Sequence, residues 1–127
     1  MSIEGKQTYA ALYARVSSER QAEEKTIESQ LAALREHAAK QGYTVSEEHV
    51  FTDNGISGTE LIRPGLEALR DLVATQAINR IVVLCPDRLS RKQAHQLILS
   101  EEFLRHDVDL EFVNYTASSS PEDQLFL

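Results

Sequence analysis

The sequence predicts an α/β domain, in which a mostly parallel sheet of about four to five strands carries helices on both faces. Two observations predict this class. Short segments that are apolar, or that alternate between apolar and polar residues, are separated along the chain by longer segments whose apolar residues recur at helical spacing. The segment 79–84 contains a continuous apolar run, as expected of a strand that is buried on both faces of a parallel sheet.

Four segments are predicted strands. Residues 9–16 are apolar and partly β-favouring, and residues 108–114 alternate between apolar and polar types. Residues 79–84 form the buried strand, and residues 43–51 form a less regular one. Three helical segments separate these strands, so the predicted order is strand then helix three times over, followed by a fourth strand.

The first two predicted helices have recognisable ends. The first follows Thr26 as N-cap and stops near Gly42. The second begins at Pro64, because a proline in the first turn of a helix loses no hydrogen bond. The positions expected to face the sheet are Ile27, Leu31, Leu34 and Ala38 in the first helix and Leu66, Leu69, Leu72 and Val73 in the second.

The third predicted helix begins with a capping box. Ser90 and Gln93 have the spacing at which each side chain satisfies a backbone donor of the first turn. The positions expected to be buried in this helix are Ala94, Leu97, Ile98 and Leu104. Residues 115–120 are loop-like, and Pro121 starts what reads as a further helix.

Length and charge limit the function. A chain of 127 residues suits one domain, and its single cysteine, Cys85, excludes an internal disulfide and fits a reducing cytoplasm. No apolar run is long enough for a membrane helix or a signal peptide. A net charge of −7 argues against a nucleic-acid binder, unless the positive charge is concentrated at one site or the DNA-gripping part lies outside this chain.

The loops after the first three strands hold an unusual set of polar residues. In parallel sheets, sites form beyond the carboxyl ends of the strands, which selects residues 15–26, 52–63 and 85–92. These loops contain Arg15, Ser17, Ser18, Arg20, Gln21, Asp53, Ser57, Arg63, Asp87, Arg88, Arg91 and Lys92. A hydroxyl among several guanidinium groups suits a phosphoryl substrate, because arginine stays charged and binds phosphate oxygens with two parallel hydrogen bonds.

No cofactor is expected. The four histidines are scattered without the paired spacing of metal ligands. Neither a Walker loop nor GxGxxG is present, so the sequence predicts neither ATP nor a dinucleotide. Arginines can replace a metal, since phosphoryl transfer depends mainly on prearranged positive charge around the transition state.

Each of these residues also has an ordinary structural interpretation. A serine after a strand is more often a turn or cap residue than a nucleophile. Arg88 and Arg91 could be the solvated start of a helix, although cations at that end oppose the helix dipole. The remaining polar residues could be surface groups or turn formers: Gln21, Gln30, Asp53 and Asp87.

Three blocks of sequence resemble the catalytic domain of serine site-specific recombinases, the resolvase and invertase superfamily. The run Tyr13-Ala14-Arg15-Val16-Ser17-Ser18 with Gln21 resembles the active-site motif Tyr-x-Arg-Val-Ser-Ser/Thr-x-x-Gln. The stretch from Phe51-Thr52-Asp53 through Ser57-Gly58 to Arg63-Pro64-Gly65 is similar to the second block, and Asp87-Arg88-Leu89-Ser90-Arg91 is similar to the third. The blocks occur in the family's order.

The resemblance implies a resolvase-like, flavodoxin-like fold and a role for each matching residue. Ser17 would attack a DNA phosphodiester, leaving a 5′-phosphoserine link and a free 3′-hydroxyl. The arginines Arg15, Arg63, Arg88 and Arg91 would surround the scissile phosphate. Asp87 would serve as general acid or orient an arginine. The supporting positions would be Tyr13, Gln21, Gln30 and Asp53. No general base is evident, because no histidine stands near Ser17 in the sequence.

The resemblance also implies partners. Such enzymes act on double-stranded DNA recombination sites, and four subunits cut, exchange and rejoin strands for integration, excision, inversion or transposition. The segment between Gln21 and Gln30 and the phrase Ser120-Pro121-Glu122-Asp123 resemble the large serine recombinases of mobile elements. The chain is expected to stop at Leu127 inside the dimerisation helix and to lack the DNA-binding domain, so that alone it would be inactive. Two alternatives remain: a degenerate recombinase domain that acts as an assembly module, and an unrelated α/β phosphatase or nucleotide-binding domain.

Overall fold

The computed structural model describes residues 7–16, 26–54 and 63–114. In chain order the elements are β2 (Ala10–Val16), α1 (Ile27–Gln41), η2 (Glu47–His49), β3 (Val50–Asn54), α2 (Pro64–Thr75), β4 (Arg80–Val83), α3 (Pro86–Leu89), α4 (Gln93–Arg105) and β5 (Asp109–Phe112). Within these residues the sheet has four strands in the order β3-β2-β4-β5, and every pair is parallel. The predicted α/β class is confirmed.

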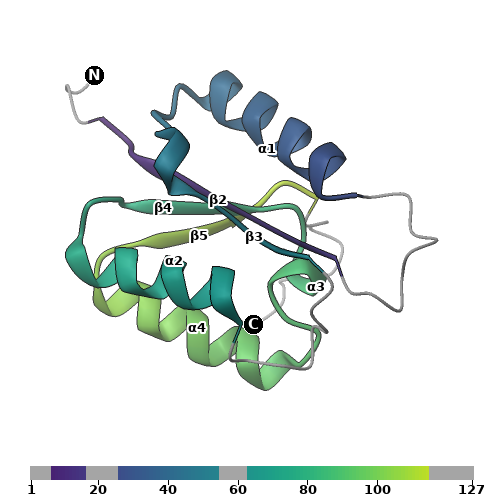
Figure 1. Ribbon diagram of the computed structural model, residues 1–127. Helices are drawn as coiled ribbons and strands as arrows, with labels where there is room; N and C mark the ends of the chain where they lie inside the picture. Colours follow the sequence, from purple (N-terminus) through teal and green to yellow (C-terminus); the bar gives the residue numbers. More distant parts are fainter. Residues whose placement is uncertain (1–6, 17–25, 55–62, 115–127) are drawn as a thin grey trace.

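The helices cover both faces of the sheet. Figure 1 shows α1 on one face, α2 and α4 side by side on the other, and α3 at the end of the sheet where the strands finish. Val82 on β4 and Leu84 just after it pack in the hydrophobic cluster under α1. Ile81 and Val83 on β4 pack in the hydrophobic cluster under α2 and α4. Both faces of β4 are therefore buried, as its apolar run predicts.

The order of the strands creates a switch point. The chain leaves β2 through α1 to reach β3 on one side, then crosses back through α2 to reach β4 on the other side of β2. The segments that follow β2 and β4 therefore diverge at the same edge of the sheet. In open α/β sheets this is where ligands bind.

The first helix begins and ends as predicted, and the second begins as predicted. Thr26 caps α1 by accepting a hydrogen bond from the Ser29 backbone, and Gly42 closes it in the left-handed conformation with φ of 78°. Pro64 is the first residue of α2. The buried positions Leu34, Ala38, Leu66, Leu69 and Val73 all belong to the predicted faces.

The strand predicted at 43–51 is wrong over most of its length. Thr44 makes an isolated bridge to Tyr9, residues 47–49 form a 3-10 turn, and β3 begins only at Val50. The apolar residues before β3 pack against the core under α1 without strand geometry, which explains the misleading pattern. The strand then extends to Asn54, so Asp53, predicted in a loop, lies on β3 beside Arg15.

The capping box at Ser90 is also wrong. The short helix α3 occupies residues 86–89, Ser90 ends it, and α4 begins at Gln93 without a side-chain cap. The buried face of α4 is Leu99 and Phe103, whereas Leu97, Ile98 and Leu104 are about half exposed. Ala94 is exposed too. Two apolar stripes compete on this helix, and the one with the large aromatic ring is buried.

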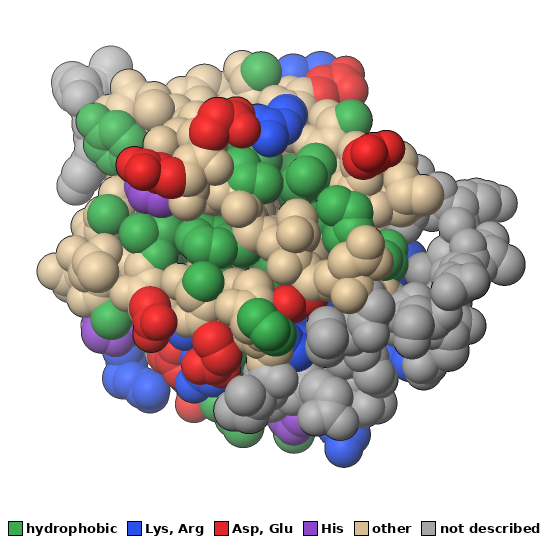
Figure 2. Space-filling view, in the orientation of Figure 1, with side chains coloured by type: hydrophobic (Ala, Val, Ile, Leu, Met, Phe, Trp, Pro, Cys, Tyr) green, Lys and Arg blue, Asp and Glu red, His purple; other side chains and the backbone are tan. Residues whose placement is uncertain are grey.

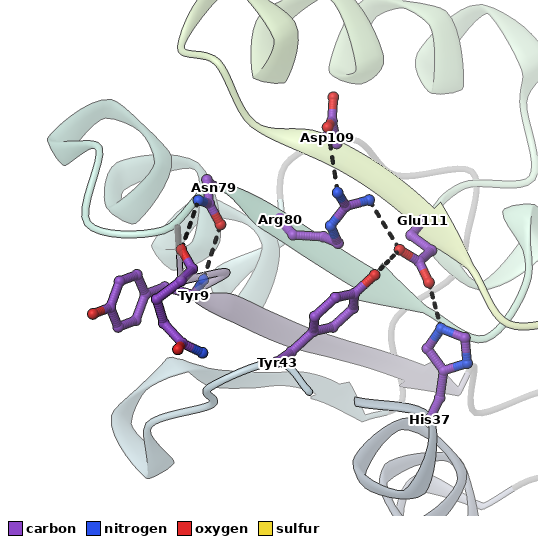
Figure 3. A network of polar contacts seen from close by, with 8 residues as sticks. Tyr9, His37, Tyr43, Asn79, Arg80, Asp109 and Glu111 are labelled. Carbon is purple, nitrogen blue, oxygen red and sulfur yellow. Dashed lines mark hydrogen bonds and ion pairs between the residues drawn. The ribbon is translucent and has the colours of Figure 1, made fainter. Parts of the chain in front are cut away.

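A polar network joins α1 to the sheet (Figure 3). Glu111 on β5 accepts hydrogen bonds from His37 on α1, from the Tyr43 hydroxyl at 2.7 Å and from Arg80 at 3.0 Å. Burial would raise the pKa of Glu111, but the hydrogen bonds from His37 and Tyr43 and the charge of Arg80 outweigh it and lower that pKa. Glu111 is thus an ionised carboxylate with three donors.

The described surface is consistent with an acidic chain. Figure 2 shows Asp and Glu side chains above and below a central hydrophobic area on the face seen in Figure 1, with few Lys or Arg side chains over that area. No helix within 7–16, 26–54 and 63–114 is long and apolar enough to cross a membrane. The loop and helix expected at 115–120 and from Pro121 lie outside the described residues.

Candidate active site at the carboxyl ends of the strands

Arg15 enters the site from the end of β2. Because side chains alternate along a strand, Arg15 lies on the same face as Tyr13, and only 1% of it is exposed. Its Nη2 donates to the carbonyl of Asp87 at 2.9 Å, and its Nε to the carbonyl of Arg88 at 3.3 Å. Burial lowers the pKa of Arg15, and the positive charge of Arg63 lowers it further.

The acceptors for Arg15 belong to α3. A helix of one turn leaves its last carbonyls without partners inside the helix, and these carry the negative end of the helix dipole. Cations that donate to them are stabilised, and two arginines do so: Arg15 bonds to residues 87 and 88, and Arg63 Nη2 bonds to Leu89. The one-turn helix α3 therefore docks two buried guanidinium groups.

Arg63 has binding capacity left over. It is fully buried, yet its Nε and Nη1 have no hydrogen-bond partner among the described residues. Its guanidinium carbon lies 5.7 Å from the centre of the Tyr13 ring. A buried charge with unused donors is costly, and an anion that fits between the donors removes that cost.

Arg88 completes a group of three, which we name the arginine cluster: Arg15, Arg63 and Arg88. Only 8% of Arg88 is exposed, and its Nη1 donates to the carbonyl of Arg15 at 3.5 Å. Because Arg88 is buried within α3, the alternative of a solvated helix start is wrong for it. Arg15 on β2, Arg63 before α2 and Arg88 on α3 converge from three segments that are far apart in the sequence, as predicted.

Asp87 and Arg91 lie next to the cluster and are more exposed. The carboxylate of Asp87 is 3.9 Å from Nε of Arg91, and the two side chains are 54% and 28% exposed. Such a pair contributes little to stability. The carboxylate of Asp87 is therefore accessible, while its carbonyl holds Arg15.

Asp53 ties β3 to the start of α2. Its carboxylate accepts from the backbone of Gly65 at 2.7 Å and of Leu66 at 2.9 Å, and from the Tyr13 hydroxyl at 2.7 Å. It caps α2 from a distant strand, and Arg63 immediately precedes that helix. Burial raises the pKa of Tyr13, and the bond to Asp53 raises it further, so Tyr13 stays a hydrogen-bond donor at neutral pH.

The comparison with family models identifies the domain. The chain matches the model described as Resolvase, N terminal domain, over residues 10–127. The chain belongs to this family. The predicted family resemblance and the resolvase-like fold are confirmed.

Relatives of this resolvase-family domain include a protein named Putative DNA recombinase from Bacillus subtilis (strain 168), 38% identical over 117 residues. That match covers 91% of this chain and 22% of the relative, so the chain spans about a fifth of the relative's length. The N-terminal catalytic domain of TP901-1 integrase is similar with a TM-score of 0.76 at 30% identity, over 84% of this chain and 78% of that one. The C-terminal catalytic domain of ISC1926 TnpA, an IS607-like serine recombinase, gives 0.73 at 32% identity, over 85% and 72%.

Several predicted residues of this resolvase-family domain lie outside the described residues: Ser17, Ser18, Arg20, Gln21 and Ser57. The described part of β2 ends at Val16, so Ser17 is the next residue along the chain after the strand that carries Arg15. Among the residues that the structure describes, no three His, Cys, Asp or Glu side chains are grouped as a metal ion would require.

Gln30 is not the surface residue of the ordinary interpretation. It is fully buried on α1, its Nε2 donates to the Arg15 carbonyl at 3.0 Å, and its Oε1 accepts from the Arg15 backbone nitrogen at 3.4 Å. Its amide thus pairs with both backbone groups of Arg15. The side chain holds the end of β2 in place, which agrees with a supporting position.

Gly65 belongs to the second motif block, but the sequence predicted no role for it. A Cβ atom there would lie 2.3 Å from the Thr52 carbonyl oxygen, so only glycine lets α2 approach β3 this closely. The glycine that follows Pro64 was the available signal. Its absent side chain allows Asp53 to reach the helix backbone.

Proposed function

We propose that this domain is the catalytic domain of a site-specific DNA recombinase that cleaves a phosphodiester with Ser17. The observation that carries the proposal is the buried Arg63 with two unused donor atoms, beside Arg15 and Arg88 and at the end of the strand that leads to Ser17. A phosphodiester is an anion whose oxygens match these donors. Membership of the resolvase family supports the same reaction.

The proposed step is a transesterification. The Ser17 hydroxyl loses its proton to solvent and its oxygen attacks phosphorus, the bond from phosphorus to the 3′ oxygen breaks, and the 3′ oxygen takes up a proton. One phosphate ester replaces another, so rejoining needs no ATP. The arginine cluster stabilises the charge on the non-bridging oxygens and favours the ionised form of a nearby hydroxyl.

The other residues have assigned parts in this proposal. Asp87, with its accessible carboxylate, protonates the leaving 3′ oxygen or orients Arg91, and Arg91 adds positive charge beside it. Asp53 and Tyr13 hold the start of α2 and with it Arg63. Gln30 holds the end of β2, and Gln21 supports the nucleophile.

The proposed partners are duplex recombination sites and further copies of the protein. The chain has a net charge of −7, and the face seen in Figure 2 is not a basic platform, so we assign tight DNA binding to other parts of the protein. We place the protein in the large serine recombinase subgroup, with dimers and tetramers as its working forms. The small share of the Bacillus subtilis relative that this chain spans supports that placement. The reaction is assigned to the cytoplasm, where the DNA is.

The test is to identify the protein–DNA adduct chemically. The natural gene product is expressed in its own cells, purified under denaturing conditions and digested with nuclease and protease. Mass spectrometry is expected to find a nucleotide joined through its 5′ phosphate to the peptide that contains Ser17. This design needs no knowledge of the target site.

Two variants make the test specific. Ser17→Ala is expected to abolish the adduct, while Ser18→Ala keeps it in part. An adduct that survives Ser17→Ala overturns the assignment of the nucleophile. Absence of any adduct, together with hydrolysis of a small phosphate ester, would favour the phosphatase alternative.

A further inference from the structure

We propose that Gln96 is a positioning residue, which holds the turn 86–90 in the place where it orients the arginine cluster. The inference deepens the proposed recombinase function and rests on it for its effect on DNA cleavage. Neither the motif blocks nor the predicted site residues include Gln96. It lies on α4, one turn after the helix begins.

Each of the five carbonyls of residues 86–90 accepts a hydrogen bond from a side chain. The central three, of Asp87, Arg88 and Leu89, accept from Arg15 and Arg63. The outer two, of Pro86 and Ser90, accept from the side chain of Gln96 at 3.3 and 2.6 Å. Gln96 therefore fixes both ends of the segment whose middle holds the arginines.

The chemistry of the amide suits this position. A glutamine side chain carries two N–H donors on one nitrogen, and here they meet two carbonyl oxygens. The Pro86 carbonyl also accepts from the Ser90 backbone nitrogen at 3.0 Å, so Gln96 adds a second bond there and a bond to the Ser90 carbonyl just past the end of α3. A side chain without donors would lose both bonds to the turn and loosen its attachment to α4.

Gln96 also links the turn to the core. Leu99 and Phe103 follow it at three and seven positions along α4, and both are fully buried against the sheet. The helix face that packs on the core is the one that presents Gln96. The turn 86–90 is thus anchored to a packed helix, and displacing it would shift the acceptors of Arg15 and Arg63.

The predicted consequence is a defect in chemistry with intact DNA binding. Gln96→Leu keeps the size of the side chain and removes its donors. We expect the rate of adduct formation in the natural gene product to fall roughly 10²-fold, because a displacement of about 1 Å in a catalytic group has that effect. The affinity of the variant for DNA is expected to stay within about twofold of that of wild type. The matched control is Gln93→Leu, an exposed glutamine one turn earlier on α4.

Gln96→Glu provides a readout that a merely structural role would not give. The ionised carboxylate has no donor, while the protonated acid has one. Relative to wild type at the same pH, adduct formation by Gln96→Glu should be low at neutral pH and recover as pH falls toward the range of glutamate pKa values. Gln96→Leu should show no such recovery. Equal rates for Gln96→Leu and wild type would overturn the proposal.

A second measurement keeps the inference testable if the proposed function fails. In the ¹⁵N-labelled 127-residue chain, exchange of the Arg15 Nε–H with solvent is followed by NMR. We expect faster exchange in Gln96→Leu than in wild type and in Gln93→Leu. Faster exchange in a protein that forms no DNA adduct would overturn the recombinase function and keep the positioning role. Unchanged exchange would overturn the positioning role itself.

Discussion

Two groups of arginines in this domain have opposite surroundings. Arg70 and Arg80 pair with carboxylates: Arg70 makes two bonds to Glu102, at 2.7 and 2.9 Å, and Arg80 reaches Glu111 and Asp109. In the arginine cluster, Arg15 and Arg63 instead donate to backbone carbonyls of α3. The hydrogen bond to Glu102 raises the pKa of Arg70, whereas burial and Arg63 lower that of Arg15.

The difference matches the division that we propose between arginines that stabilise the fold and arginines that bind the substrate. A carboxylate partner cancels the charge of an arginine and holds two elements together. A carbonyl partner fixes the orientation of the guanidinium group and leaves its full charge available. Arg80 also has a buried Nε without a partner among the described residues, but both of its terminal nitrogens pair with carboxylates. Arg63, whose Nε and Nη1 have no partner among the described residues, keeps donors available where the substrate is proposed to bind.

The largest expected effect comes from Arg88→Ala. We expect adduct formation by the natural gene product to fall by roughly 10³-fold or more, as for arginines in other phosphoryl-transfer enzymes. The fold is expected to survive, which circular dichroism of the 127-residue chain checks. Arg70→Ala is the matched control from the other group: it should lower the unfolding midpoint and leave cleavage nearly normal. The reverse pattern for the two variants would contradict the distinction between the arginine cluster and the carboxylate-paired arginines.

Gly65→Ala should affect both stability and cleavage. The new Cβ would meet the Thr52 backbone at 2.3 Å, so α2 must move away from β3 and from Asp53. We expect a loss of about 1–3 kcal/mol in the free energy of unfolding, measured with urea. Gly42→Ala is the control, because it strains a left-handed residue in open space and lies far along the chain from the cluster. Slower cleavage in Gly42→Ala as well would show that instability alone explains the effect.

Glu111→Gln tests a carboxylate partner in the group of Arg70 and Arg80. The pKa of Glu111 is lowered in the fold, so its ionised form contributes stability above the ordinary glutamate pKa, and that contribution disappears as pH falls through the lowered value. We expect the free energy of unfolding to fall by roughly 1–2 kcal/mol at neutral pH and hardly at all in acid. Urea unfolding across pH measures it. A loss that stays constant with pH would mean that the charge of Glu111 contributes nothing.

The smallest expected effect is that of Arg35→Gln. Arg35 and Glu47 are 2.7 Å apart, but their side chains are 43% and 79% exposed. Such pairs contribute about 0–1 kcal/mol, and the variant should unfold within that margin of wild type. A larger loss in the free energy of unfolding, measured with urea, would show that a carboxylate pair stabilises the fold even when it is exposed to solvent.

The position of the site could be predicted because of the sheet. Parallel strands end at one edge, so Arg15, Arg63 and Arg88 had to converge once the strands were recognised. Fold class, the caps Thr26 and Gly42, and the buried strand 79–84 also follow from local patterns. These features depend on residues close together in sequence, where spacing is informative.

The rest depends on contacts that spacing does not encode. Gln30 and Gln96 look like surface residues, and only the packed structure brings their amides to buried carbonyls. The buried face of α4 was mispredicted because two apolar stripes share one helix and the sheet selects between them. The strand at 43–51 was misplaced because core-facing residues need not be in a strand. Ser17 lies outside the described residues, so its role stays a prediction.

The central claim is that the arginine cluster binds a phosphodiester through the unused donors of Arg63. The direct measurement is NMR of arginine Nε–H groups in the ¹⁵N-labelled chain during titration with dimethyl phosphate, a small phosphodiester anion. We expect a saturable shift of the Arg63 Nε–H, little change at the carboxylate-paired Arg35, and no saturable shift at Arg15 in an Arg63→Met variant. An Arg63 signal that stays unchanged, or one that moves no more than that of Arg35, would contradict the account.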